Sequence, residues 1–430
     1  MIFSTLAFGS VDTWAMGFLA IAAAFVGFLW LADARKKREF RFSSSLLQLP
    51  IVGLILLAAF QLLPFGAAND ANLLNAPISH ALTLDSFATK LGIIQLVVML
   101  IFFASALTFI NNQSRLRIVT TTLIIFGCAM AVFGLIQFFS DPAKIYWVRE
   151  PFQANPFASF VNKHHFAGLM LMLTSLTLGL IYSKSLGNEK RPLLIFAVVL
   201  MGVAMVFTAS RGALVSLLGV LAFLTLANLS RRESENSNKT FGGKLLLIGG
   251  GLSVILILLG GTLFLGGGDS VLRGVTLGAG QDDISNGRLH FWATTLEIIR
   301  DNPILGVGLE AFGVAYTKYD TWSGIYRIER AHNEYLNFLA ETGFVGFALI
   351  VGFIVILLRD GLRVYNTTND RFRRGVCLGA LSGCVGILIH SFFDFPLHTP
   401  SNLLIFLTLA ALATVTIHFP KLYRQSRSKN

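Results

Sequence analysis

Charged residues are scarce in this chain of 430 residues, at 13% of the total against 54% for hydrophobic residues. Soluble globular proteins carry about 25% charged residues, so the composition excludes an ordinary soluble domain. Apolar stretches of roughly 18 residues or more recur along the sequence, and each can cross the ~30 Å hydrocarbon core of a bilayer. We therefore predict an all-α, polytopic integral membrane protein.

Cysteine is rare as well, and Cys128, Cys377 and Cys384 all lie within apolar stretches. The separation of Cys377 and Cys384 corresponds to about 10 Å of rise on a helix, which is too far for a disulfide. We expect these cysteines to be packing residues, and they carry no information about the compartment.

Acidic residues are nearly absent from the apolar stretches, where ion-coupled transporters usually need them. Known enzyme signatures are missing too. "HNEYLNF" (332–338) is not the H-E-x-x-H of zinc proteases, no G-x-S-x-G marks a serine nucleophile, and the external loops hold no D-x-D. Polar residues gather instead at the external face, which favours an enzyme whose site opens at the membrane surface.

Hydropathy predicts about eleven spans, near 14–32, 45–63, 90–110, 118–138, 165–183, 193–209, 212–229, 244–266, 344–358, 375–391 and 402–418. An interfacial helix would bring the number to about twelve. The sequence begins without the basic segment of a signal peptide, so we interpret 14–32 as a retained span. The short span at 344 is expected to continue back into a helix that carries His332.

The net charge of +11 does not indicate nucleic-acid binding, because the basic residues are concentrated in short segments. Six of them hold 23 of the 34 Lys and Arg residues: 35–41, 111–117, 183–191, 230–244, 359–374 and 421–430. The positive-inside rule places such segments in the cytoplasm. The carboxy terminus is then inside, whereas the amino terminus and the long loop at 267–335 are outside.

We divide the chain into N-terminal spans (1–140), central spans (141–266), a long periplasmic loop (267–335), C-terminal spans (336–418) and a basic cytoplasmic tail (419–430). Loops of this length usually carry function. Within it, Leu289, Trp292, Leu296 and Ile299 recur at helical spacing, which predicts an amphipathic helix over 287–300 that lies along the membrane. "DNP" at 301–303 would end that helix.

Two arginines are candidates for an anion site, because a guanidinium binds phosphate oxygens in a bidentate manner. Arg211, in "FTASRGALVS", stands alone between two apolar stretches. Arg288 begins the predicted amphipathic helix, and a helix N-terminus also favours an anion. Asn286 or Ser285 would cap it. The alternatives are a snorkelling arginine at a helix end for Arg211 and a solvated loop charge for Arg288.

His332 lies at the outer edge of a predicted span, beside Arg330, Asn333 and Tyr335. Histidine is the commonest side chain for proton transfer near neutral pH, so His332 is a candidate general base. The alternative is a structural histidine. Arg330 and Glu334 are spaced to pair on a helix surface, which would give Arg330 a structural role.

Two further segments place polar side chains outside. Asp394, in the turn at 389–402, either pairs with an arginine, orients His332 or only caps a helix. Asn162 precedes His164 and His165 at the entrance to a span. These adjacent histidines point to different helix faces, which argues against a shared metal, and we expect no metal site.

Two segments of the loop region resemble a known family: "NGRLHFWATTLEIIRDNPILGVGLEAFG" (286–313) and "RAHNEYLNFLAETGFVGFALI" (330–350). They are similar to the signature region of the O-antigen ligase and O-antigen polymerase superfamily of bacterial inner-membrane glycosyltransferases. "ASRGA" (209–213) and "NPFASFVNKHHFAG" (155–168) resemble segments upstream in that family. The matching motifs extend over about 155–402, whereas 1–140 resembles the family only in hydropathy.

The resemblance implies a GT-C-like helical fold that transfers a glycan from undecaprenyl diphosphate to an acceptor hydroxyl at the periplasmic face. Arg211 and Arg288 would hold the diphosphate, and His332 would deprotonate the acceptor. The family's acid falls on Asp394. Further candidates near the site are Tyr335, Asn333, Arg330 and Asn162.

Such a transfer needs charge stabilisation as the diphosphate departs, which two arginines can supply. We therefore expect a metal-independent enzyme without a cofactor. With lipid A–core as acceptor it is an O-antigen ligase, and the alternatives are a polysaccharide polymerase or a protein O-oligosaccharyltransferase. Outside the enzyme class, the alternative is a polysaccharide or lipid-carrier transporter. Its partners would be the lipid-linked glycan, the acceptor and membrane lipids, but no nucleic acid.

Overall fold

The computed structural model of the protein describes residues 1–65, 81–152, 154–235, 287–321 and 327–416. These residues form helices and no strands; two isolated β-bridges join Ile145 to Arg149 and Phe157 to Phe160. The predicted all-α class is therefore confirmed. The predicted span at 244–266, the cap residues Ser285 and Asn286, the start of the long loop (267–286) and the tail (419–430) lie outside the described residues.

Ten apolar helices coincide with ten of the predicted spans. Seven of those described are long and apolar enough to cross a membrane: α2 (Thr13–Lys37), α4 (Ser86–Phe109), α5 (Gln113–Ser140), α6 (Lys163–Tyr182), α8 (Arg211–Glu235), α13 (Glu334–Thr367) and α14 (Arg371–His390). Three are shorter: α3 (Gln48–Gln61), α7 (Arg191–Phe207) and α15 (Pro400–Thr414). The fold is that of a polytopic membrane protein.

The centre of the bundle is the pair α6 and α14, which α7, α8 and α15 surround. A side chain at Gly179 of α6 would collide with the backbone of Gly379 in α14, so glycine lets these two helices approach closely. Cys377 and Cys384 are buried in α14 as free thiols, which confirms their packing role. This rigid centre carries the turn between α14 and α15, where Asp394 lies.

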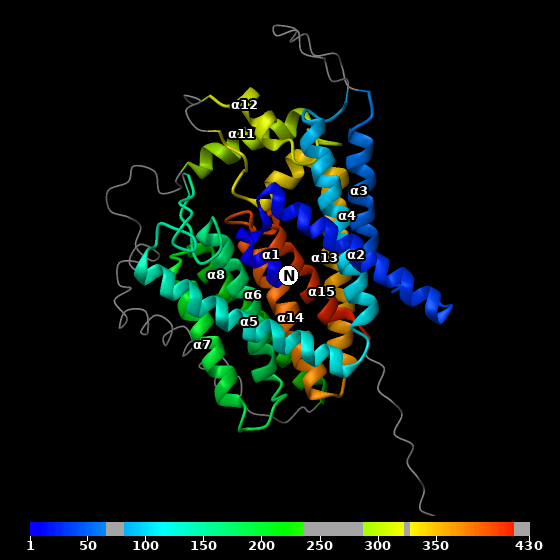
Figure 1. Ribbon diagram of the computed structural model, residues 1–430, viewed down its shortest axis with the longest axis vertical. Coiled ribbons are helices and arrows are strands. Elements are labelled where there is room, and N and C mark those ends of the chain that lie inside the picture. The colour runs from blue at the N-terminus through cyan, green and yellow to red at the C-terminus, as the bar shows by residue number, and fades with distance from the viewer. Residues whose placement is uncertain (66–80, 153, 236–286, 322–326, 417–430) are drawn as a thin grey trace, which may run out of the picture.

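Five shorter elements are also described. They are α1 (Ile2–Leu6), the 3-10 turn η1 (Phe8–Ser10), α11 (Arg288–Asp301), α12 (Phe312–Tyr319) and the 3-10 turn η3 (Pro396–His398). In Figure 1, α11 and α12 lie together at the top, while the connection between α6 and α7 lies at the bottom. The segments that were predicted to face opposite sides of the membrane thus lie at opposite ends of the bundle.

The helix predicted over 287–300 is α11, and the four apolar residues that predicted it divide between two directions. Leu289 and Leu296 are 66% and 54% exposed and face away from the protein. Ile299 is buried, and Trp292 packs against the same group of buried residues, which lies between α11, α12 and α13.

The span predicted from 344 does continue back to Glu334, but His332 does not lie on that helix. Asn333 is the N-cap of α13, and His332 precedes it with a left-handed φ of +51°. Within α13, Gly343 has a φ of +60° and interrupts the helix, where a side chain would collide with the backbone of Ile304. The predicted helical setting of His332 is thus wrong, and a loop positions this residue.

Candidate active site

His332 and Asp394 are brought together from two separate loops. The His332 Nδ1 atom lies 3.2 Å from Asp394 Oδ1. The Asp394 side chain is 2% exposed, whereas that of His332 is 34% exposed. One ring nitrogen is therefore engaged by a buried carboxylate, and Nε2 is the nitrogen that a substrate can reach. This is the arrangement of a general base with an orienting acid.

Two aromatic rings fix the plane of the His332 imidazole. Phe291 of α11 stacks on it at 5.9 Å between ring centroids, and Phe395 meets it edge-on at 5.0 Å. The backbone N–H of Phe395 also donates to Asp394 Oδ1 at 2.9 Å. Because Phe395 contacts both partners, it aligns the carboxylate and the imidazole with each other.

The carboxyl group of Asp394 is held in its charged form. Burial by itself would raise the pKa of Asp394, but the hydrogen bond with His332 and the nearby His164 and His165 outweigh it. The net effect is a pKa well below the usual range of an aspartic acid. An ionised Asp394 can stabilise an imidazolium on His332 after that residue accepts a proton.

Arg288 and Arg211 are the first residues of α11 and α8. Arg288 lies close enough to His164 and His390 for its charge to act on both. On α8, Gly212 packs against His390 and Phe393. Gly287, with a φ of +79°, occupies the N-cap of α11, a position that the sequence had assigned to Asn286 or Ser285.

Three of the other predicted residues have structural contacts. Asn333 caps α13, because its side chain accepts the N–H groups of Tyr335 and Leu336. Asn162 caps α6 by accepting the N–H of His164 at 2.9 Å. The Tyr335 hydroxyl donates to the Leu388 carbonyl at 2.7 Å. These side chains hold helix ends in place, and none of these contacts is with His332 or Asp394.

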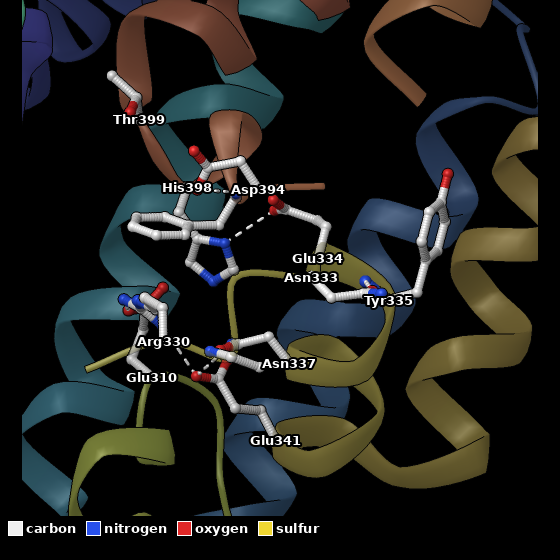
Figure 2. Close-up of polar contacts among 12 residues, drawn as sticks. Glu310, Arg330, Asn333, Glu334, Tyr335, Asn337, Glu341, Asp394, His398 and Thr399 are labelled. Carbon is white, nitrogen blue, oxygen red and sulfur yellow. Dashed lines mark hydrogen bonds and ion pairs between the residues drawn. The ribbon is translucent and has the colours of Figure 1, made fainter. Parts of the chain in front are cut away.

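Arg330 belongs to a buried cluster (Figure 2). Its guanidinium bonds Glu310, and its Nη1 lies 2.9 Å from Oε1 of Glu341. The surface pair with Glu334 that the spacing predicted is not formed, because Glu334 bonds His398 Nδ1 at 2.8 Å instead. Glu310, Glu341 and His398 also lie close enough together to hold a metal ion. Arg330 already places a positive charge beside two of these carboxylates, those of Glu310 and Glu341.

Electrostatics favour the charged forms of Arg330, Glu310 and His398. Burial opposes the charge of Arg330, but Glu310 and Glu341 raise its pKa above the ordinary arginine value. Burial likewise opposes the charge of Glu310, and Arg330 nevertheless lowers its pKa. Burial and Arg330 would lower the pKa of His398, but Glu334 raises it overall.

Several of these residues could not be identified from the sequence. Glu310 is far from Arg330 along the chain, and no spacing rule connects them. Asn337 and Glu341 occur in the recognised segment, but their direction toward Arg330 depends on the fold. Phe395 is one of 38 phenylalanines, and only its contacts distinguish it.

The fold and the site together define a polytopic α-helical membrane protein with a histidine–aspartate pair and two arginines at the end of its bundle. Residues 196–351 match the family model described as O-antigen ligase. The predicted resemblance to that family is therefore confirmed over these residues. The matched residues include Arg211, Arg288 and His332, whereas Asp394 lies beyond them.

A curated relative extends the comparison. The chain is 25% identical over 207 residues to the exopolysaccharide production protein ExoQ of Rhizobium meliloti (strain 1021). That match covers 46% of this chain and 43% of the relative. Less than half the length of the relative is thus matched.

Proposed function

We propose that the protein transfers a glycan from undecaprenyl diphosphate to an acceptor hydroxyl at the periplasmic face of the bacterial inner membrane, as an O-antigen ligase does with lipid A–core. The observation that carries the proposal is the His332–Asp394 pair, in which a reachable imidazole is held by a buried, ionised carboxylate. The family match over 196–351 supports the same class of reaction.

In this proposal each group has one step. The acceptor hydroxyl donates its proton to Nε2 of His332 while its oxygen attacks the anomeric carbon of the donor sugar. The bond from that carbon to the diphosphate oxygen breaks, and the electron pair leaves with undecaprenyl diphosphate. Arg211 and Arg288 stabilise the charge on this leaving group. Asp394 stabilises the imidazolium, which later returns its proton to solvent.

The site is proposed to work without a metal ion. The leaving group is a diphosphate, whose developing charge two guanidinium groups at helix N-termini can balance. The cluster of Glu310, Glu341 and His398 does not change this assignment, because Arg330 already bonds two of its carboxylates.

A second candidate is a polysaccharide polymerase, in which the acceptor is another lipid-linked repeat unit. The match to a protein named for exopolysaccharide production favours it. The same base and the same diphosphate site would serve both reactions, so the two candidates differ in the acceptor alone.

The test uses the full-length protein in lipid nanodiscs and, in parallel, in lipid vesicles, with a fluorescent undecaprenyl-diphosphate glycan as donor and EDTA present. Lipid A–core, a second lipid-linked repeat unit and a serine-containing acceptor protein are offered separately. A conjugate of glycan and lipid A–core supports the ligase, and a longer lipid-linked glycan supports the polymerase. Donor movement across a vesicle membrane with no new glycosidic bond would contradict the proposal and favour a transporter. Activity that appears only when divalent metal is restored would contradict the metal-independent mechanism.

A further inference from the structure

The backbone that leads into His332 is fixed at two consecutive peptide groups. The Ala331 N–H donates to Asn337 Oδ1 at 3.1 Å, and the Ala331 carbonyl accepts from Trp292 Nε1 at 3.0 Å. His332 itself has a φ of +51°, in the left-handed region that few residues other than glycine adopt. Such a conformation persists only where the surrounding structure holds it. Asn337 and Trp292 provide that hold.

The side chain of Arg330 is connected to Asn337, one of the two residues that fix this backbone. Its Nη1 donates to Oε1 of Glu341 at 2.9 Å, and the Asn337 Nδ2 donates to that same oxygen at 3.0 Å. Asn337 in turn bonds Ala331, which follows Arg330 in the chain. The contacts therefore close a ring through Arg330, Glu341, Asn337 and Ala331. Glu341 and Asn337 are both fully buried.

The ring is attached to the membrane-spanning bundle. The backbone carbonyl of Glu341 accepts from Gly308 N at 3.0 Å and from Gln61 Nε2 of α3 at 2.9 Å. Gln61 also accepts the Leu309 N–H at 3.0 Å. The segment that carries Glu310, the second partner of Arg330, is thereby fixed to α3 and α13. A displacement of His332 would have to break these buried contacts.

We propose that Arg330, Glu341 and Asn337, together with Trp292, are positioning residues that hold His332 against Asp394. None of them touches the reacting atoms, and their effect on transfer passes through the backbone of Ala331. The expected effect on transfer rests on the proposed function, in which His332 is the base. The expected effect on the position of His332 is independent of that function.

The experiment compares Glu341→Gln and Asn337→Leu with wild type. Glu341→Gln keeps an acceptor but removes the charge, and Asn337→Leu removes both hydrogen bonds at similar volume. The matched control is Glu334→Gln, which removes a buried carboxylate from the same helix but outside the ring. Trp292→Phe removes one hydrogen bond and keeps an aromatic side chain, so it tests the same claim if the buried variants do not accumulate.

The first readout is the rate at which diethylpyrocarbonate modifies His332, followed by mass spectrometry. We expect several-fold faster modification in the ring variants and in Trp292→Phe, because the imidazole is released from Asp394, and no change in Glu334→Gln. Wild-type rates in folded ring variants would overturn the proposal, whatever their transfer activity.

The second readout is catalytic. In the ring variants, kcat should fall about tenfold or more while the affinity for the donor stays the same. Unchanged kcat would also overturn the proposal. The proposed function fails separately, if His332→Asn itself transfers at the wild-type rate.

Discussion

Two histidine–carboxylate pairs lie within a few residues of each other, and they differ in access. His332 bonds Asp394 at 3.2 Å, and His398 bonds Glu334 at 2.8 Å. Both carboxylates are buried, but the His332 side chain is 34% exposed and that of His398 is 8% exposed. The shorter bond belongs to the residue that a substrate cannot reach. The pairing alone therefore does not single out a base, and the choice of His332 as the proposed base rests on its exposure.

The surroundings of the two pairs also differ. Glu334 raises the pKa of His398 although burial and Arg330 act to lower it, so His398 tends to carry a proton and is a poor acceptor. Beside His332, the hydrogen bond holds the pKa of Asp394 low despite burial, so this carboxylate stays charged. In the proposed function, the pair with His332 accepts a proton, whereas the pair with His398 serves the fold.

The largest expected difference comes from replacing each histidine. His332→Asn, chosen because asparagine tolerates a left-handed backbone, should lower the transfer rate by about 10²–10⁴-fold. His398→Gln should keep the rate within a few fold and lower thermal stability. Donor binding should be unchanged in both, since the arginines hold the diphosphate. Single-turnover transfer and donor binding in nanodiscs measure this, and the reverse order of effects would exchange the two assignments.

Replacing the two carboxylates should distinguish the pairs in the same way, with a smaller effect on kcat. Asp394→Asn cannot favour the tautomer with the proton on Nδ1 or stabilise the imidazolium, so we expect a loss of about 10²-fold in kcat. Glu334→Gln should lose little. Equal losses in the two variants, at equal abundance in the membrane, would mean that both pairs serve only the fold.

The arginines should show a smaller effect still. Arg211→Lys and Arg288→Lys keep the charge but lose the planar fork, and each should lower kcat/KM for the donor by about tenfold. Arg327→Lys is the matched control, since Arg327 is an exposed arginine that pairs with Glu329 in the same loop region. Steady-state kinetics with the lipid-linked donor measure the effect. Wild-type values for both lysine variants would leave a snorkelling arginine and a solvated charge as the better interpretations.

The smallest expected effect concerns stability and pH. The pKa of His398 is raised by Glu334 in the folded protein, against burial, so this pair stabilises most below about pH 6.5, the unfolded value. The contribution is lost as the pH rises through the folded pKa. The melting temperature of wild type should therefore fall relative to His398→Gln between about pH 6 and pH 9. Parallel melting curves for the two proteins would show that the pair contributes no pH-dependent stability.

Hydropathy predicted the spans well, because the length of an apolar stretch is a local property of the chain. The histidine, the arginines and Asp394 came from recognised motifs, and the structure brings His332 and Asp394 together. Which apolar residues of α11 pack against the protein was not predictable, because periodicity shows that a face is apolar but not which surface it contacts.

Contacts between residues that only the tertiary fold brings together could not be predicted from the sequence either. The spacing of Arg330 and Glu334 predicted a pair, but Arg330 lies before the helix, so the surface geometry of a helix does not apply. Its partners Glu310 and Glu341 come from a loop and a helix that only the tertiary fold places together. Positioning networks of this kind depend on three-dimensional contacts rather than on local patterns.

The most direct test of His332 as the general base is chemical rescue of His332→Gly. Glycine accepts the backbone φ of +51° and leaves an opening where the exposed imidazole lay. The account predicts that this variant binds donor, transfers almost no glycan, and recovers transfer in a saturable manner when imidazole is added, whereas imidazole does not change His398→Gly. Transfer by His332→Gly at the wild-type rate without imidazole would contradict it.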